Sequence, residues 1–190
     1  VLAGCNMERA ENHMVFRYNE PAGIPSLDPA FAKEKSSIWA VQQLYEGLVA
    51  LDVNNYISPA LADDWKIDST ATVYTFRLRD AQFHNGKSVT AQDVVYSLTR
   101  LKDPRVASPG SWVVEGVSAC REIDASTVEI VLQEPNSSFL SLLAMPFCSI
   151  IPSGETALNS APVGTGPFKF HVWHYGEKLV LHKNEMYWRI

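Results

Sequence analysis

Histidines are the first residues in this sequence whose type and spacing could support catalysis or metal binding. His171 and His174 are separated by two residues in a predicted strand, so we expect their side chains on opposite faces and no shared metal ion. His84 precedes Asn85-Gly86, a strong tight-turn signal. It could act as a base, but no serine or cysteine nucleophile motif lies in a strand-turn-helix context. A histidine in a turn needs no catalytic role.

Glycine and carboxylate spacing does not indicate an enzyme either. Gly164-Thr165-Gly166 is too short for a dinucleotide-binding fingerprint and leads into a strand rather than a helix. Asp63-Asp64 and Asp80 are separated by a predicted strand, so we assign no acid-base dyad. We therefore predict no catalytic residues, no metal site and no cofactor.

Two cysteines in the middle of the chain, Cys120 and Cys148, form a possible pair. Neither has a partner cysteine at the close spacing typical of structural zinc sites. In an exported protein an even pair suggests a disulfide, which would contribute about 3 kcal/mol on the chain-entropy model. Two buried free thiols are the alternative, because cysteine is among the most buried residue types. Both alternatives stay open on the sequence.

The N-terminus carries the third cysteine. Leu2-Ala3-Gly4-Cys5 resembles the lipobox that ends a bacterial lipoprotein signal peptide. We expect cleavage before Cys5, whose sulfur takes a diacylglycerol and whose new amine takes a further acyl chain. Two or three chains anchor a protein stably where one is marginal. The polar stretch Asn6 to His13 then forms a tether. The alternative is a short apolar N-terminus that ends in cysteine by chance.

Composition places the sequence among globular proteins. Of its 190 residues, 46% are hydrophobic and 19% are charged, which excludes disordered, collagen-like and coiled-coil chains. There are 16 basic and 21 acidic residues, a net charge of −5, which argues against a nucleic-acid partner. No apolar run is long enough to span a bilayer as a helix.

Periodicity predicts helices and strands in mixed order. Helices are predicted over 37–49, 90–101 and 136–145, and a helical turn at 58–62 that places Trp65 against the body. Alternating or β-rich runs predict strands at 15–18, 48–51, 73–79, 116–123, 127–132, 147–151, 168–173 and 178–182. Because the strands form antiparallel hairpins, this order favours a mixed α+β fold over alternating parallel strands.

Two loops expose backbone groups in fixed directions. One contains Pro21, Gly23 and Pro25, and the other runs from Gly164 to Pro167. Such backbone can pair with an extended peptide by strand addition, in which main-chain hydrogen bonds give affinity without reading side chains. Two ordinary turns are the alternative, and the residues alone leave both open.

Seven ordered blocks cover residues 16 to 190 almost without a gap. They are Ser26-Leu27-Asp28-Pro29, Leu44-Tyr45-Glu46-Gly47-Leu48, Pro59 to Trp65, Tyr74 to Arg79, Phe83-His84-Asn85-Gly86-Lys87, Thr90 to Ser97, and Val163 to Phe168 followed by Trp173, Gly176-Glu177 and Asn184 to Trp188. In this order they resemble the peptide/nickel family of extracellular solute-binding proteins.

The resemblance implies a receptor rather than an enzyme. Members stand in the bacterial cell envelope, in the periplasm or lipid-anchored at the outer face of the membrane, capture oligopeptides or dipeptides and deliver them to the permease of an ABC importer. Two lobes close over the ligand by hinge motion. One alternative is a receptor of the same fold for nickel chelate, haem, glutathione or another solute. The other is a truncated lobe that acts as a structural or protein-interaction module.

The resemblance also implies the domain organisation of a type II periplasmic binding protein. Residues 1–14 would be the signal remnant and tether, 15–49 and 152–190 the main sheet of lobe one, and 50–151 an inserted subdomain. Lobe two is absent, so we interpret the sequence as an N-terminal piece that lacks the acidic residue for a peptide amine.

The same resemblance supplies candidate ligand-binding residues from three segments. Gly110 and Ser111 have little or no side chain where some peptide binders have a bulky one, so the resemblance does not determine the size of the pocket. The candidates are Pro21, Ala22, Gly23, Ile24, Trp112, Gly164, Thr165 and Gly166.

Overall fold

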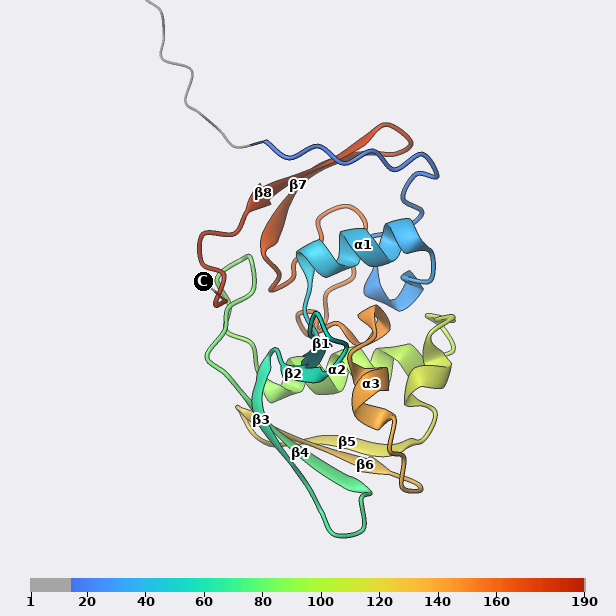
Figure 1. The fold of residues 1–190 in the computed structure, drawn as a ribbon, viewed down its shortest axis with the longest axis vertical. Helices are drawn as coiled ribbons and strands as arrows, with labels where there is room; N and C mark the ends of the chain where they lie inside the picture. The colour runs from blue at the N-terminus through green and yellow to red at the C-terminus, as the bar shows by residue number, and fades with distance from the viewer. Residues whose placement is uncertain (1–14, 190) are drawn as a thin grey trace, which may run out of the picture.

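A computed structural model of the chain describes residues 15–189. The expected acylation of Cys5 and the tether at 1–14 lie outside the described residues. The described part is elongated: a two-stranded hairpin lies at its upper end in Figure 1, and a four-stranded sheet lies at its lower end. It mixes helices with antiparallel sheets, as the α+β prediction required.

The elements follow one another in a mixed order. The α-helices are α1 (Lys35–Leu44), α2 (Ala91–Lys102) and α3 (Phe139–Leu143), and the 3₁₀ turns are η1 (Pro29–Phe31), η2 (Ser111–Val114) and η3 (Pro146–Cys148). The strands are β1 (Val49–Leu51), β2 (Ile57–Pro59), β3 (Ala62–Ile67), β4 (Val73–Leu78), β5 (Val117–Asp124), β6 (Thr127–Leu132), β7 (Phe168–His174) and β8 (Lys178–Lys183). They form sheets ordered β1-β2, β3-β4-β6-β5 and β7-β8. No helix of the described part is long and apolar enough to cross a membrane.

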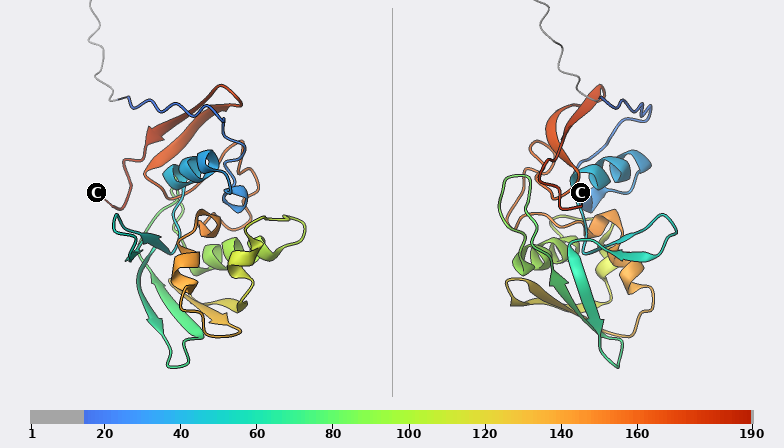
Figure 2. Two further views of the ribbon diagram at one scale, coloured as in Figure 1. Left: turned by 45° about the vertical axis from the view of Figure 1, so that its right-hand side comes forward. Right: turned by 60° about the vertical axis from the view of Figure 1, so that its left-hand side comes forward.

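The four-stranded sheet encloses the lower core because every second side chain of its central strands is buried and those between are more accessible. Tyr74 and Phe76 of β4 point inward and pair with Ile130 and Val128 of β6. Helix α2 covers this face of the sheet, as the two views of Figure 2 show. Phe139 of α3 meets the Tyr74 ring edge-on, with ring centroids 4.9 Å apart.

Helix α2 begins where the sequence predicts. The Asp93 carboxylate accepts hydrogen bonds from the Thr90 amide and hydroxyl, both at 2.8 Å, and so satisfies donors at the helix start. Its other oxygen accepts the Ser153 amide at 2.8 Å. A single carboxylate therefore caps α2 and attaches the chain that leads to the upper half.

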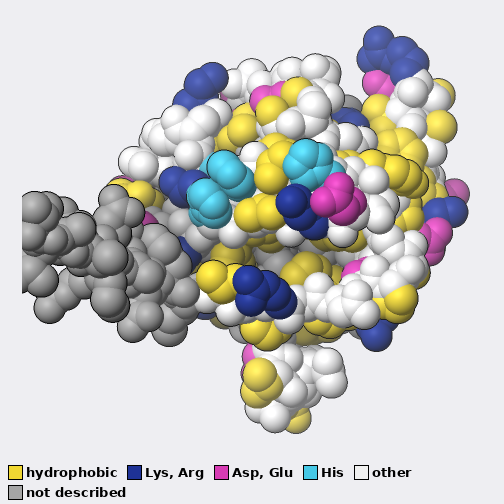
Figure 3. Space-filling view, turned by 90° about the horizontal axis from the view of Figure 1, so that it is seen from above, with side chains coloured by type: hydrophobic (Ala, Val, Ile, Leu, Met, Phe, Trp, Pro, Cys, Tyr) yellow, Lys and Arg dark blue, Asp and Glu magenta, His cyan; other side chains and the backbone are white. Residues whose placement is uncertain are grey.

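A second core lies between α1 and the β7-β8 hairpin. Buried Val41 and Leu44 of α1 face Phe170 and Leu181 of the hairpin. Histidine side chains lie on the upper surface, with basic and acidic side chains beside them (Figure 3). On the hairpin, His171 stacks on His182 with ring centroids 4.2 Å apart. Groups of three or more metal-ligating side chains are absent from the described residues.

Three predicted elements are wrong. The extended segment 15–18 pairs with no strand among the described residues. The predicted helical turn at 58–62 is the end of β2 and the start of β3, which places Trp65 within a strand. The apolar run 147–151 forms part of η3 and a loop, because Pro146 starts a 3₁₀ turn there instead of a strand.

Candidate functional site

The loop at 21–24 presents backbone groups to solvent. Pro21 and Ala22 are exposed, and Gly23 and Ile24 are half-buried. Gly23 has a φ of 68°, a conformation that glycine adopts without strain, and its amide closes a turn on the Glu20 carbonyl at 3.2 Å. No described residue donates a hydrogen bond to the carbonyls of 21–24. These groups are free for an external partner.

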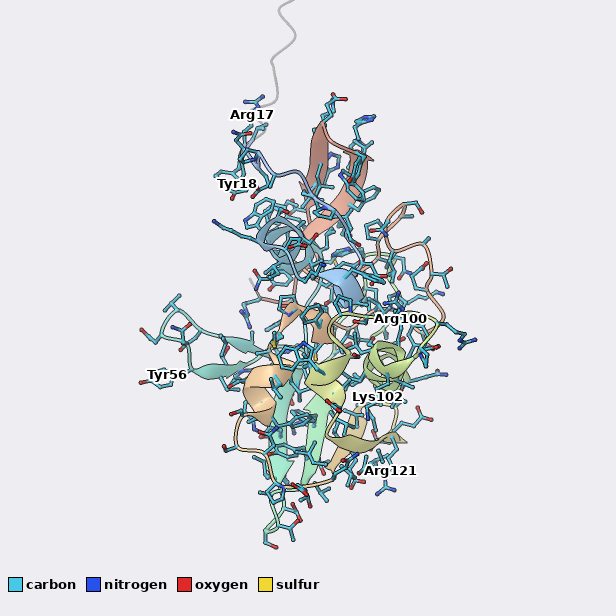
Figure 4. The ribbon with its side chains drawn as sticks, turned by 90° about the vertical axis from the view of Figure 1, so that its right-hand side faces the viewer. Arg17, Tyr18, Tyr56, Arg100, Lys102 and Arg121 are labelled. Carbon is cyan, nitrogen blue, oxygen red and sulfur yellow. The ribbon has the colours of Figure 1, made fainter. Side chains whose placement is uncertain are left out.

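Side chains on both flanks fix the position of this loop. Before it, Tyr18 stacks on Trp39 of α1, with ring centroids 4.7 Å apart and the Tyr18 side chain at the upper end of the molecule (Figure 4). After it, the Asn159 side-chain oxygen accepts the Leu27 amide at 2.8 Å and the Ser26 hydroxyl at 3.0 Å. The loop is therefore exposed, but contacts on both flanks hold it in a fixed position.

A buried ion pair follows the loop. The Arg100 guanidinium, midway along the molecule in Figure 4, donates two hydrogen bonds to the Asp28 carboxylate at 2.9 and 2.6 Å. The side chains are only 16% and 7% exposed. The same carboxylate accepts the Ala30 amide at 2.9 Å and caps η1. Because the charges neutralise each other, they stabilise the loop rather than offer a free charge to a ligand.

Trp112 lies on η2 with 52% of its surface exposed. It borders a hollow of about 260 Å³ together with Phe139 and Leu142. The segment before it is held by the Ser108 hydroxyl, which donates to the Ala30 carbonyl at 2.6 Å and accepts the Gly110 amide at 3.0 Å. Trp112 and the loop at 21–24 therefore lie on segments that converge on η1.

Gly110 has a structural reason to lack a side chain. A Cβ there would lie 2.4 Å from ring atoms of Phe147. The small residue makes room for this buried ring and does not enlarge a ligand pocket.

A larger hollow of about 700 Å³ lies along α2. Its charged side chains include Arg100 and Arg105, which pair with Asp28 and Asp103 respectively. These two cations are already neutralised within the protein. Glu155, which also lines the hollow, has no cationic partner among the described residues and accepts the Thr156 and Ala157 amides at 2.9 and 2.8 Å.

Gly164, Thr165 and Gly166 occupy the interior rather than a ligand-facing edge. All three are buried. A Cβ on Gly164 would lie 2.0 Å from the Leu44 carbonyl oxygen, and the Gly166 amide donates to the same carbonyl at 3.0 Å. This segment packs against the end of α1, so in the described chain it is not part of the surface formed by 21–24.

Sequence reasoning missed two groups that hold this region. The His84 imidazole contacts the backbone of both Gly164 and Gly166. The Glu46 carboxylate accepts hydrogen bonds from the Tyr187 hydroxyl at 2.7 Å and from the Trp188 indole. Burial raises the pKa of Glu46. The blocks that contain these residues were visible in the sequence, but their contacts join segments far apart along the chain.

Cys120 and Cys148 are free thiols in the structure, so the disulfide alternative is wrong. Cys120 lies half-buried on β5 and Cys148 is buried in η3. Burial raises the pKa of each thiol to about 12. Both pack with the lower core as apolar side chains.

An exposed loop with unpaired carbonyl groups is typical of a surface that binds an extended ligand. The chain belongs to the bacterial extracellular solute-binding proteins, family 5: the model of the family's middle region matches residues 56–189.

Named relatives are binding proteins. The chain is 32% identical to the periplasmic oligopeptide-binding protein OppA of Salmonella typhimurium, over 90% of this chain and 36% of the relative. Two solved structures share 32% identity and cover 87% of the chain: AgaA of A. tumefaciens R10 in complex with agropinic acid (TM-score 0.83, 35% of that protein) and DppA of Helicobacter pylori in complex with the peptide STSA (TM-score 0.79, 38% of that protein). The chain thus spans about a third of the length of the relatives it matches.

Proposed function

We propose that this chain forms one wall of a receptor that captures oligopeptides or dipeptides outside the inner membrane and delivers them to an ABC permease. The observation that carries the proposal is that the loop at 21–24 is held in position by its flanks while its carbonyl groups accept no hydrogen bond from the described residues. An extended peptide can pair with such backbone whatever its side chains are. Similarity to peptide-binding relatives supports the same ligand class.

In the proposed receptor, residues 15–49 and 152–190 belong to the main part of lobe one, and residues 50–151 form its inserted subdomain. The two hydrophobic clusters support this division. Leu27, Val41 and Leu158 belong to the upper cluster, whereas the sheet β3-β4-β6-β5 and α2 supply most of the lower cluster. A second lobe would provide the opposite wall of the cleft.

A lipid anchor on Cys5 belongs to the same proposal, with the receptor held in the cell envelope. Intact mass measured after expression in a bacterial host should show a Cys5 that carries a diacylglycerol and begins the mature chain. Cys5→Ser is the matched control and should keep an unmodified N-terminal region. An unmodified Cys5 in the wild-type protein would rule out the anchor.

The peptide proposal is tested by calorimetry on the full-length receptor that contains this chain. A mixed peptide pool should bind with a dissociation constant near 1 μM or tighter, about −8 kcal/mol. Gly23→Val should weaken that binding about tenfold or more, because a β-branched residue cannot hold the positive φ and the loop must change path. Gly176→Val is the matched control, since Gly176 has a φ of 72° and its Cβ position is equally open.

The second candidate is a receptor of the same fold for a small solute that is not a peptide. The complex of a similar structure with agropinic acid favours it. The calorimetry separates the two candidates: a full-length receptor that ignores peptides but binds a non-peptide solute would replace the first proposal with the second.

A further inference from the structure

His84 lies at the contact between the two cores, in the tight turn that precedes α2. The Phe83 amide donates to the Lys87 carbonyl and the Gly86 amide to the Phe83 carbonyl, both at 2.8 Å. Phe83 is buried in the lower core, so the turn is anchored to that core. The neighbouring His84 side chain points the other way, toward the buried loop at 164–166.

Three hydrogen bonds join His84 to this loop. The His84 amide donates to the Gly164 carbonyl at 2.8 Å, and the Gly164 amide donates to Nδ1 of the imidazole at 3.2 Å. Nε2 lies 3.1 Å from the Gly166 carbonyl oxygen. Because an amide can only donate, Nδ1 must accept, and the single ring proton belongs on Nε2. The contact therefore requires a neutral imidazole in one tautomer.

The opposite side of the loop contacts the upper core. The Gly166 amide donates to the Leu44 carbonyl at the end of α1, and the Asn184 side-chain amide donates to the Gly166 carbonyl at 3.0 Å. Gly164 lies too close to Leu44 for any Cβ. The loop is thus wedged between α1 and the His84 imidazole, which makes His84 a direct link between the two cores.

No acidic side chain among the described residues raises the pKa of His84. Burial is the largest effect and lowers the pKa of His84 from 6.5. The hydrogen bond to Gly166 raises the pKa in part, and Lys169 of β7 lowers it further. Asn184 approaches from the segment after β8 and is neutral. Asn85 and Lys87 belong to the same turn as His84, and the Asn85 side chain is engaged by the Lys87 amide at 3.1 Å.

We propose that His84 is a proton-sensitive positioning residue: its neutral imidazole holds the loop at 164–166 against α1, and its protonation releases that loop. A proton on Nδ1 would face the Gly164 amide proton, donor against donor, and the hydrogen bond at 3.2 Å would be lost. The role is separate from ligand binding and does not depend on the proposed function.

The direction of the pH effect follows from linkage. Burial places the pKa of His84 in the folded chain below its ordinary value of 6.5, so between those two values the unfolded chain binds more protons than the folded one. The contribution of His84 to stability is therefore complete above pH 6.5 and is lost as the pH falls through the pKa of the folded state.

The test compares urea unfolding of wild type and His84→Gln in the 190-residue chain between about pH 7.5 and pH 5. A glutamine can accept from Gly164 through its oxygen and donate to Gly166 through its amide, but it cannot take up a proton. We expect the unfolding constant of the wild type to rise about threefold or more beyond that of His84→Gln over this range. His174→Gln is the matched control, an exposed histidine that should keep the wild-type pH profile.

A site-specific readout completes the test. After correction for the intrinsic exchange rate, which falls as the pH falls, the protection factor of the Gly164 amide should be several-fold smaller at the lower pH in the wild type and unchanged in His84→Gln. His84→Leu, which can neither accept nor donate, should show a small protection factor at both pH values. The proposal is overturned if His84→Gln keeps the full wild-type pH dependence, or if ring nitrogen chemical shifts place the proton on Nδ1.

Discussion

At the residue scale, the absence of a side chain on Gly164 allows the loop at 164–166 to pack against α1. We predict that Gly164→Ala lowers the free energy of unfolding by about 3 kcal/mol, because its Cβ would lie 2.0 Å from the Leu44 carbonyl oxygen and backbone must move. Urea unfolding measures the difference. Gly116→Ala is the control, since a Cβ there meets no atom within 4 Å. Equal stability of the two variants would contradict the close packing of this loop.

The Asp28–Arg100 pair gives a second prediction at this scale. Arg100→Leu should lower the free energy of unfolding by about 3–5 kcal/mol, because it leaves the Asp28 carboxylate buried without its cation. Thermal and urea unfolding provide the measurement. Arg77→Leu is the matched control: it breaks an ion pair with Asp63 that lies largely in solvent, and we expect a change within experimental error. A similar loss in both variants would show that burial does not determine how much an ion pair contributes to the free energy of unfolding.

At the element scale, Glu46 ties the chain after β8 to the end of α1. Its carboxylate accepts from Tyr187 and Trp188, and the Arg79 guanidinium lies 3.6 Å from the Trp188 ring centroid. Segment 184–189 is therefore held by one side chain from the loop after α1 and one from the loop after β4.

We predict that Glu46→Ala destabilises the chain by about 1–3 kcal/mol, because two partly buried donors lose their acceptor. The Trp188 fluorescence should shift to longer wavelength as the indole gains contact with water. Glu177→Ala, at an exposed position of the β7-β8 turn, serves as the control. An unchanged Trp188 spectrum in Glu46→Ala would show that other contacts, such as Arg79 and Arg189 over the ring, hold Trp188 in place.

Most elements could be predicted from the sequence because their side-chain pattern records burial on one face. β4 alternates buried residues with half-buried or exposed ones along its whole length, and Thr90 with Asp93 marks the start of α2. β3 could not be predicted in this way, since Asp63 and Asp64 are both exposed and a register shift interrupts the alternation there. Its existence depends on pairing with β4, which local pattern does not encode.

The candidate surface was predictable only in part for a similar reason. Proline and glycine at 21–23 indicate an exposed loop, and the structure has one. Gly164 and Gly166 lie in a loop that is also rich in glycine and proline, but both are buried, because the Leu44 carbonyl lies beside them in the fold. Composition predicts that backbone is accessible to a close partner. It does not tell whether that partner is a ligand or another part of the same chain.

At the scale of the whole molecule, buried polar contacts orient the two cores. Asp28 joins the loop before α1 to Arg100 of α2, the Ser97 hydroxyl of α2 accepts the Ile151 amide at 2.9 Å, and the Asp93 carboxylate accepts the amide of Ser153. Hydrogen bonds are directional, whereas apolar contacts tolerate sliding. These contacts therefore fix the orientation of one core relative to the other in the described chain.

In the proposed receptor this chain is a single wall, which sets a limit on what the 190 residues can bind by themselves. Small-ligand sites enclose most of the ligand surface, and closure of a second body over the ligand adds contacts and excludes water. The chain spans about a third of the length of its named relatives, and its loop at 21–24 offers contacts from one side only.

We therefore predict that calorimetry of the isolated 190-residue chain with the peptide pool gives no measurable heat at micromolar concentrations, whereas the full-length receptor binds. Circular dichroism and a cooperative unfolding transition would confirm that the isolated chain is folded in that experiment. The Gly23→Val variant of the isolated chain should then behave like the wild type, since there is no binding for the loop to support. Micromolar binding by the isolated chain would instead mean that this third of the receptor holds a complete ligand site, with hinge closure needed only for transport.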